Sequence, residues 1–178
     1  MLHRRRVLSK PAVMALLTLV VAAAAWAGKP QTDSERLDRI HRLFKRSKFF
    51  FFRKVPEMTV DELLVARRQR PIVLLDSRSP AERAVSTIPG AVGKDELDAA
   101  RAAMPEATVV VYCTIGHRSG IVASRMRRHG VDAVNLVGGV LAWAHAGQSF
   151  TDDGEPTRTV HVYGRRWSLL PHDYVATW

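Results

Sequence analysis

Residues 109–119 read Val-Val-Val-Tyr-Cys-Thr-Ile-Gly-His-Arg-Ser, an apolar run that ends in a short polar loop. β-Branched and aromatic residues at 109–112 are typical of a buried strand in a parallel sheet. From Gly120 onward, apolar residues recur on one face and predict a helix. The loop therefore lies between the carboxyl end of a strand and a helix start, which is where open α/β sheets bind ligands.

Cys113, the only cysteine of the chain, lies in this loop. Loop amides, the start of the following helix and the guanidinium of Arg118 would stabilise a thiolate there, with His117 as a further contributor. An ionised thiol is a strong nucleophile. The alternative is that Cys113 is a small buried apolar residue, as free cysteines often are.

Three further stretches accompany the loop: Leu-Leu-Asp-Ser-Arg-Ser-Pro-Ala-Glu at 74–82, Ile-Pro-Gly-Ala at 88–91, and Leu-Val-Gly-Gly-Val-Leu-Ala-Trp at 136–143. Together with Cys-x-x-Gly-x-Arg-Ser at 113–119, they resemble the signature stretches of the rhodanese-like sulfurtransferases and occur in the same order. The resemblance implies an α/β fold, with an open, mostly parallel sheet flanked by helices on both faces.

Loop length distinguishes this family from phosphatases and arsenate reductases of related architecture. The active-site loops of those enzymes resemble Cys-x5-Arg, a loop wide enough for a tetrahedral phosphate. In this chain, only four residues separate Cys113 from Arg118. The shorter ring leaves room for one extra sulfur, whose negative charge the loop N–H groups can stabilise. Sulfur transfer therefore fits the loop better than phosphoryl chemistry.

The resemblance implies that Cys113 takes a sulfur atom from a small-molecule donor such as thiosulfate, becomes a persulfide, and passes the sulfur to a thiol or to cyanide. It implies no metal and no cofactor. Two alternatives stay open: a non-catalytic module that uses the loop to bind sulfur, an anion or a partner, and a phosphatase-like or arsenate-handling enzyme.

The candidate catalytic residues are Cys113 and Arg118. The rest of the loop would hold the substrate or the persulfide: Thr114, Ile115, Gly116, His117 and Ser119. Possible supporting residues are Asp76, Arg78 and Arg83. Asp76 either fixes Arg118 in place or serves as a capping or turn residue. Arg83 is either a substrate-anion ligand or a solvated charge, and a mobile His117 is favoured over a general base.

The first 27 residues predict a signal peptide, since arginines precede an apolar run that ends Ala-Trp-Ala. Cleavage before Gly28 would make the protein exported, either periplasmic or secreted. The alternative is a membrane anchor formed by residues 12–27.

The chain of 178 residues has a net charge of +10, and most of the excess precedes residue 71. Residues 28–56 form a basic segment with an amphipathic pattern. Its apolar stripe could cover the sheet, or residues 36–54 could make weak contact with an anionic membrane surface or dock a partner. No nucleic-acid partner is expected, and the oligomeric state stays open.

Residues 57–147 are expected to form the rhodanese-like domain, and residues 148–178 an extension that packs on it. The alternation of patterns predicts helices at 59–68, 94–104, 120–128 and 139–146. It predicts strands at 72–76, 133–136 and 157–163, in addition to 109–112.

Overall fold

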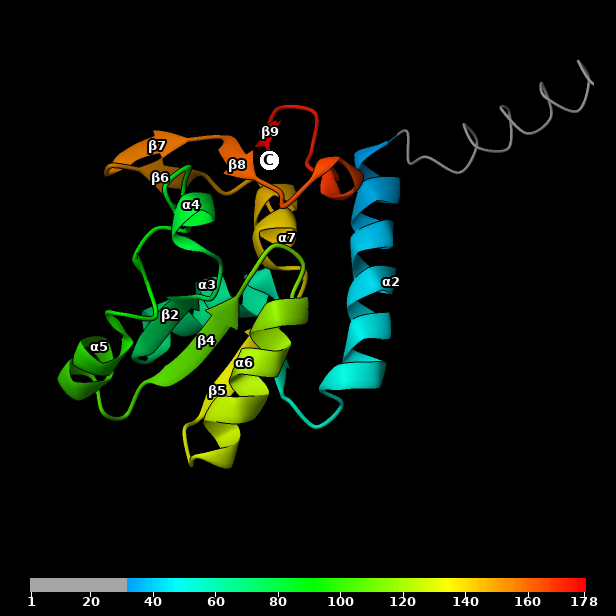
Figure 1. The fold of residues 1–178 in the computed structure, drawn as a ribbon. Coiled ribbons are helices and arrows are strands. Elements are labelled where there is room, and N and C mark those ends of the chain that lie inside the picture. The colour runs from blue at the N-terminus through cyan, green and yellow to red at the C-terminus, as the bar shows by residue number, and fades with distance from the viewer. Residues whose placement is uncertain (1–31) are drawn as a thin grey trace, which may run out of the picture. The chain divides into compact units, whose positions relative to one another are not determined.

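The computed structural model describes residues 32–178 (Figure 1). The predicted signal peptide or anchor at 1–27 lies outside these residues. Five parallel strands form the central sheet in the order β1-β5-β4-β2-β3. Their bounds are β1 Glu57–Met58, β2 Ile72–Asp76, β3 Ala91–Val92, β4 Thr108–Tyr112 and β5 Ala133–Leu136. The α/β fold with a parallel sheet is therefore confirmed.

Alternate residues of β4 face opposite sides of the sheet, and each side carries its own core. Val110 and Tyr112 belong to a cluster that includes Leu63 of α3 (Val60–Gln69) and the buried residues of α7 (Gly139–His145). Val109 and Val111 belong to a second cluster with residues of α5 (Leu97–Ala103) and α6 (His117–Arg128). Figure 1 shows α6 in front of the sheet and α3 behind it. The sheet is therefore covered on both faces, which is why β4 is buried along its whole length and apolar from Val109 to Val111.

Two helices begin at other residues than the pattern predicts. Helix α6 begins at His117, three residues earlier, because Gly116 takes the left-handed N-cap conformation with φ of 94°. Helix α5 begins at Leu97, three residues later than Lys94. The reason is a turn at 93–96, in which the Gly93 amide donates to the Glu96 carboxylate at 2.6 Å.

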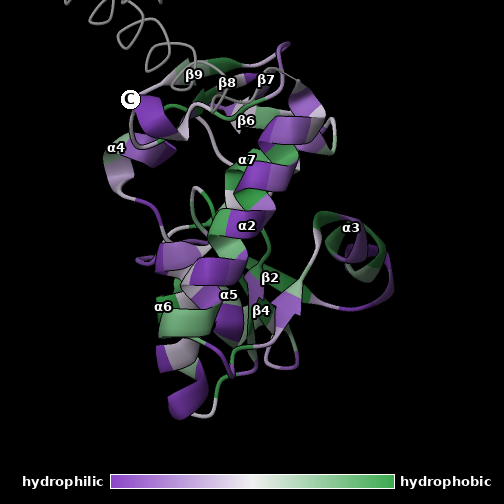
Figure 2. Cartoon of the chain, turned by 90° about the vertical axis from the view of Figure 1, so that its right-hand side faces the viewer, coloured by the Kyte–Doolittle hydropathy of each residue, from purple (hydrophilic) through white to green (hydrophobic). Residues whose placement is uncertain are grey.

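Helix α2 (Asp33–Phe51) carries most of the basic segment and packs against α6 and α7. Its inner face buries Ile40 and Phe44, whereas Figure 2 shows polar and apolar residues alternating along it. The stripe therefore covers the core, as one of the two interpretations expects. Phe49, Phe50 and Phe51 lie at the exposed end of the helix and are 58%, 66% and 62% exposed, although the Phe51 ring also packs on His117 of α6. No helix within residues 32–178 is long and apolar enough to span a bilayer.

The chain after α7 forms two small sheets. Strands β6 (Phe150–Asp152) and β7 (Glu155–Thr157) make a hairpin, and β8 (Thr159–His161) pairs in parallel with β9 (Val175–Thr177). The prediction of one strand at 157–163 is wrong, because β7 and β8 pair with different partners. The short helix α4 (Pro80–Arg83) lies beside these strands in Figure 1. Buried tail residues join the core cluster of α3 and α7: Phe150, Val160, Val162, Leu169, Leu170 and Tyr174.

Candidate active site

Cys113 follows directly after β4, and its side chain is 1% exposed. The Gly116 amide donates to the Cys113 Sγ at 3.2 Å, and the Ser119 hydroxyl donates to it at 3.5 Å. Both donors come from the loop and the first turn of α6. The sulfur therefore faces hydrogen-bond donors and the positive end of a helix dipole, an arrangement that favours a negatively charged sulfur.

Backbone groups outside the loop hold its carbonyl oxygens. The amides of Val140 and Leu141, at the start of α7, donate to the carbonyls of Cys113 and Thr114 at 2.9 and 3.3 Å. The side-chain amide of Asn135 donates to the Gly116 carbonyl at 2.8 Å. Because these donors bind the loop carbonyls from outside the loop, the carbonyls point away from the sulfur and the loop amides can point toward it.

Close approach of α7 to the loop explains the Gly138-Gly139 pair in the sequence. A Cβ on Gly139 would lie 2.0 Å from the carbonyl oxygen of Cys113, well inside contact distance. Gly139 also has a φ of 52°. Only glycine fits both the space and the backbone conformation.

Arg118 is held by Glu82. Its Nη1 and Nη2 donate to Oε2 and Oε1 of Glu82 at 2.7 and 2.6 Å, and Nη2 also donates to the Thr114 hydroxyl at 3.1 Å. These hydrogen bonds to Glu82 raise the pKa of Arg118, and the charge of an ionised Cys113 adds to the effect. Asp76 does not fix Arg118. It has the other of its two expected roles, that of a turn residue, because its Oδ1 accepts a hydrogen bond from the Arg78 amide at 3.0 Å.

Glu82 has two roles, and the sequence pattern around it indicates only the first of them. It completes a capping box with Ser79 at the start of α4, and this role already accounts for the Ser-Pro-Ala-Glu spacing. Burial alone would raise the pKa of Glu82, but the hydrogen bonds from Arg118 and Ser79 outweigh burial and lower it to about 2. Glu82 is therefore ionised at neutral pH and compensates the charge of Arg118.

Asp76 instead pairs with Arg78 beneath the site. The Arg78 Nη2 donates to Asp76 Oδ2 at 2.7 Å, and both side chains are fully buried. The Tyr112 hydroxyl donates to the same carboxylate oxygen at 2.7 Å. Burial, followed by the negative charge of Asp76, raises the pKa of Tyr112. The Asp76–Arg78 pair therefore joins the end of β2 to the end of β4 through the Tyr112 hydroxyl. Neither side chain lines the pocket.

Arg83 also lies away from the pocket lining. It forms ion pairs with Asp95 and Glu96 at 3.4 and 3.2 Å. The structure therefore gives Arg83 neither of its two expected roles, since it is neither an anion ligand at the pocket nor a purely solvated charge.

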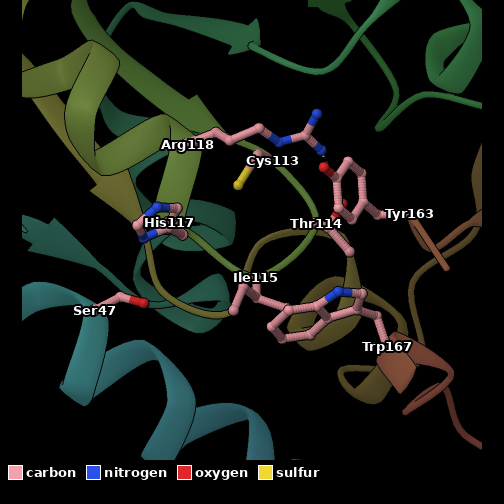
Figure 3. A pocket seen from close by; sticks show the side chains of 8 residues that line it. All are labelled: Ser47, Cys113, Thr114, Ile115, His117, Arg118, Tyr163 and Trp167. Carbon is pink, nitrogen blue, oxygen red and sulfur yellow. Dashed lines mark hydrogen bonds between the residues drawn. The ribbon is translucent and has the colours of Figure 1, made fainter. Parts of the chain in front are cut away.

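A pocket of about 310 Å³ opens over Cys113 (Figure 3). Its lining comprises Ser47, Cys113, Thr114, Ile115, His117, Arg118, Tyr163 and Trp167. Five of these were predicted from the loop. Ser47, Tyr163 and Trp167 come from α2 and the tail, and no sequence pattern linked them to Cys113. Within residues 32–178, no group of three or more His, Cys, Asp or Glu side chains could hold a metal ion.

Two of the newly found contacts fix loop side chains. The guanidinium of Arg118 lies over the ring of Tyr163, 5.0 Å from its centroid. The imidazole of His117 packs edge to face against Phe51 of α2, with ring centroids 5.0 Å apart. The helix before the domain and the tail after it therefore both reach the candidate active site.

Comparison with known proteins identifies the family of the central domain. A family model for the rhodanese-like domain matches residues 59–146. The tRNA uridine(34) hydroxylase of Xanthomonas campestris pv. campestris (strain B100) is 39% identical over 84 residues, which are 42% of this chain and 33% of that protein. The protein of the same name from Burkholderia ambifaria (strain MC40-6) is 37% identical over 84 residues, or 42% of this chain and 30% of that one.

Among solved structures, the thiosulfate sulfurtransferase from Pseudomonas aeruginosa superposes with a TM-score of 0.53 at 21% identity, covering 65% of this chain and 23% of that one. This similarity concerns the fold. The chain contains a rhodanese-like domain at residues 59–146. It spans about a third of the length of the curated relatives named above.

Proposed function

We propose that this protein is a sulfurtransferase that carries a persulfide on Cys113. The observation that carries the proposal is the pair of donors on the Cys113 sulfur, the Gly116 amide at 3.2 Å and the Ser119 hydroxyl at 3.5 Å. Donors arranged before the reaction stabilise a sulfur anion without reorganisation. The loop of four residues between Cys113 and Arg118 also suits one added sulfur better than a tetrahedral phosphate.

With thiosulfate as donor, the cycle has two displacement steps. The Cys113 thiolate attacks the outer sulfur of thiosulfate, an S–S bond to Cys113 forms, and sulfite leaves with the electron pair of the broken S–S bond. An acceptor, cyanide or a thiolate, then attacks the outer sulfur of the persulfide. The Cys113 thiolate leaves with its electron pair, and thiocyanate or an organic persulfide is released. The cycle needs neither a metal nor an external oxidant.

The curated relatives are named for hydroxylation at uridine 34 of tRNA, and the matched region is about a third of each of them. Sulfur transfer is therefore proposed from the chemistry of the loop and its donors. Export of the protein remains part of the proposal on the pattern of residues 1–27 alone.

The test combines intact mass measurement with turnover of thiosulfate and cyanide. We expect one added sulfur atom on Cys113 after incubation with thiosulfate, and thiocyanate release on adding cyanide. The Cys113→Ser variant should lose both, because a hydroxyl is a far weaker nucleophile at neutral pH. Turnover within tenfold of the unchanged protein, about 1.4 kcal/mol, would exclude Cys113 as the carrier. A sulfur adduct without turnover would favour the binding module.

A further inference from the structure

The pocket over Cys113 is larger and more apolar than a small inorganic acceptor requires. Its volume of about 310 Å³ is at the lower end of the range for organic ligands, and far above the ~30 Å³ share of one water molecule in the liquid. Ile115, Tyr163 and Trp167 supply apolar walls above the sulfur (Figure 3). Cyanide would leave most of this space unfilled.

The charge of the pocket also favours a sulfur acceptor whose body is uncharged. Arg118 is the one permanently charged side chain among the described lining residues. Its guanidinium already makes two hydrogen bonds to the Glu82 carboxylate at 2.7 and 2.6 Å. An anionic group on the acceptor has to compete with Glu82 for the same donors, as the small donor thiosulfate also does. An uncharged body meets no such competition.

Tyr163 is held over the site at an energetic cost. It is one of two non-glycine residues with positive φ in the described chain, at 71°. Left-handed backbone is strained at a residue with a Cβ. The amide of Tyr163 donates to His161 Nδ1 at 3.1 Å, which fixes the turn, and its ring stays 59% exposed over Arg118. Such strain often marks a functional position.

Trp167 adds a polar group to the apolar wall. Its Nε1 is buried, and no hydrogen-bond partner for it exists among residues 32–178. Buried N–H groups normally have a partner, so an unpaired one calls for an explanation. Figure 3 shows the nitrogen-bearing edge of the indole turned toward Thr114. The indole therefore borders the pocket with its rings as an apolar wall and with one unpaired donor at its edge.

We propose that the sulfur acceptor is an organic thiol with an uncharged aromatic or aliphatic body, bound between Tyr163 and Trp167. This inference rests on the proposed function of Cys113. The acceptor thiolate attacks the outer sulfur of the persulfide and forms a new S–S bond. The bond between that sulfur and Cys113 breaks, the Cys113 thiolate leaves with the electron pair, and the acceptor departs as an organic persulfide. The proton of the acceptor thiol goes to solvent.

The experiment isolates the second step. The full chain is loaded with thiosulfate, freed of donor, and mixed with phenylmethanethiol, 3-mercaptopropionate or cyanide, and loss of the added sulfur is followed by mass spectrometry. Each rate is divided by the concentration of the ionised thiol, so that a difference in ionisation between the two thiols does not affect the comparison. We expect the aromatic thiolate to react at least tenfold faster than the carboxylated one.

Substitutions of the two aromatic wall residues test whether they cause the preference for the aromatic thiolate. Trp167→Ala and Tyr163→Ala should each slow the aromatic thiolate at least fivefold more than they slow cyanide. Trp178→Ala is the matched control, because Trp178 is a tail tryptophan that is 55% exposed and not in the pocket lining. If Trp167→Ala does not fold, Tyr163→Ala still tests the proposal, because Tyr163 is exposed and its truncation should leave the fold intact.

The outcomes separate the two proposals. If Cys113 never takes up sulfur, the sulfurtransferase proposal fails. If Cys113 takes up sulfur and gives it to cyanide, but both thiolates react equally fast, only the acceptor inference is overturned. Equal slowing of cyanide and the aromatic thiolate by Trp167→Ala would also overturn it, because the residue would then act on the persulfide or on the fold.

Discussion

At the scale of single residues, the site depends on one carboxylate with two tasks. Glu82 caps α4 and holds Arg118, and its side chain is 5% exposed while that of Arg118 is 34% exposed. Removing one partner of such an ion pair destabilises the protein, because the other charge is left without compensation. The hydrogen bond that Arg118 donates to the Thr114 hydroxyl and the one that the Ser79 amide donates to Glu82 tie the pair to both the loop and α4.

Glu82 predicts a dependence of stability on pH. Its pKa falls from the ordinary value of 4.5 to about 2 on folding, so its contribution is full above pH 4.5 and is lost as pH falls toward 2. Glu82→Gln should lower the free energy of unfolding at pH 7 by about 2 kcal/mol, and should reduce the loss of stability between pH 4.5 and 2. Urea unfolding at several pH values measures both effects.

Glu57→Gln is the control for that experiment. Glu57 is 44% exposed and pairs with Lys48 at the surface, so its loss should cost at most about 0.5 kcal/mol. An equal effect of the two substitutions at pH 7, or an unchanged acid profile in Glu82→Gln, would contradict the role given to the Glu82–Arg118 pair.

At the scale of elements, two helix starts meet at one loop. Helix α6 begins within the loop and supplies Ser119, whereas α7 begins against the outside of the loop and binds the carbonyls of Cys113 and Thr114. The geometry of the sulfur site therefore depends on how closely α7 approaches β4. Gly139 sets that distance.

Gly139→Ala should therefore damage both stability and the site. Gly147→Ala is a matched control: Gly147 has a φ of 70°, similar to 52° at Gly139, but a Cβ there meets nothing within 4 Å. Gly147→Ala should cost about 1–2 kcal/mol from backbone strain alone. Gly139→Ala should cost at least about 2 kcal/mol more and slow alkylation of Cys113 by iodoacetamide or its sulfur uptake from thiosulfate. Equal costs for the two variants would show that α7 moves away freely.

Helix α2 leads to a prediction about membranes. Its exposed end combines Phe49, Phe50 and Phe51 with basic residues on both sides, at 45, 46, 48, 53 and 54. Aromatic rings beside cations favour the surface of an anionic bilayer. We expect the chain from residue 28 to sediment with anionic vesicles but not with zwitterionic ones, and binding should weaken as salt screens the charges.

Replacement of the three phenylalanines by serine should abolish this sedimentation. Val65→Ser is the matched control, since Val65 is an exposed apolar residue on α3, at 53%. If the triple variant binds as well as the unchanged chain, the contact is purely electrostatic or lies elsewhere. If neither binds, the exposed phenylalanines are available for a protein partner or for another segment of the chain.

At the scale of the whole molecule, the tail is part of the core. Residues 32–178 form one compact unit, and Leu169, Leu170 and Tyr174 share a cluster with α3 and α7. Arg36 of α2 donates to the Leu170 carbonyl at 2.7 Å, which links the two ends of this unit. The rhodanese-like domain should therefore unfold together with its extensions.

Leu170→Ala tests whether the tail and the rhodanese-like domain unfold together, because Leu170 lies in the tail. Leu170 is 3% exposed, and truncating a buried leucine costs about 2–5 kcal/mol. Val175→Ala, at a tail position that is 59% exposed, should cost below about 0.5 kcal/mol. Circular dichroism and tryptophan fluorescence should report one coincident transition in each variant. Separate transitions would mean that the tail folds independently.

Local pattern was sufficient for three strands of the sheet, at 72–76, 109–112 and 133–136, and for the reactive loop. Strands β1 and β3 have only two residues each and were not predicted. The largely apolar runs at 72–76 and 133–136 are strands with the predicted bounds, as expected for strands buried on both faces. The loop at 113–119 could be placed because a strand end and a helix start are both local signals. Cys113 and its Gly116 and Ser119 donors lie within seven residues, so their proximity follows from the chain itself.

Tertiary structure alone decided the partners from distant segments. Glu82 is 36 positions from Arg118, and Asp76, an equally plausible carboxylate from the sequence, turns to Arg78. Tyr163 and Trp167 reach the pocket only because the tail packs on α7 and returns over the loop. Periodicity encodes which residues are buried, but it does not encode which buried or half-buried groups meet, since that depends on the packing of whole elements.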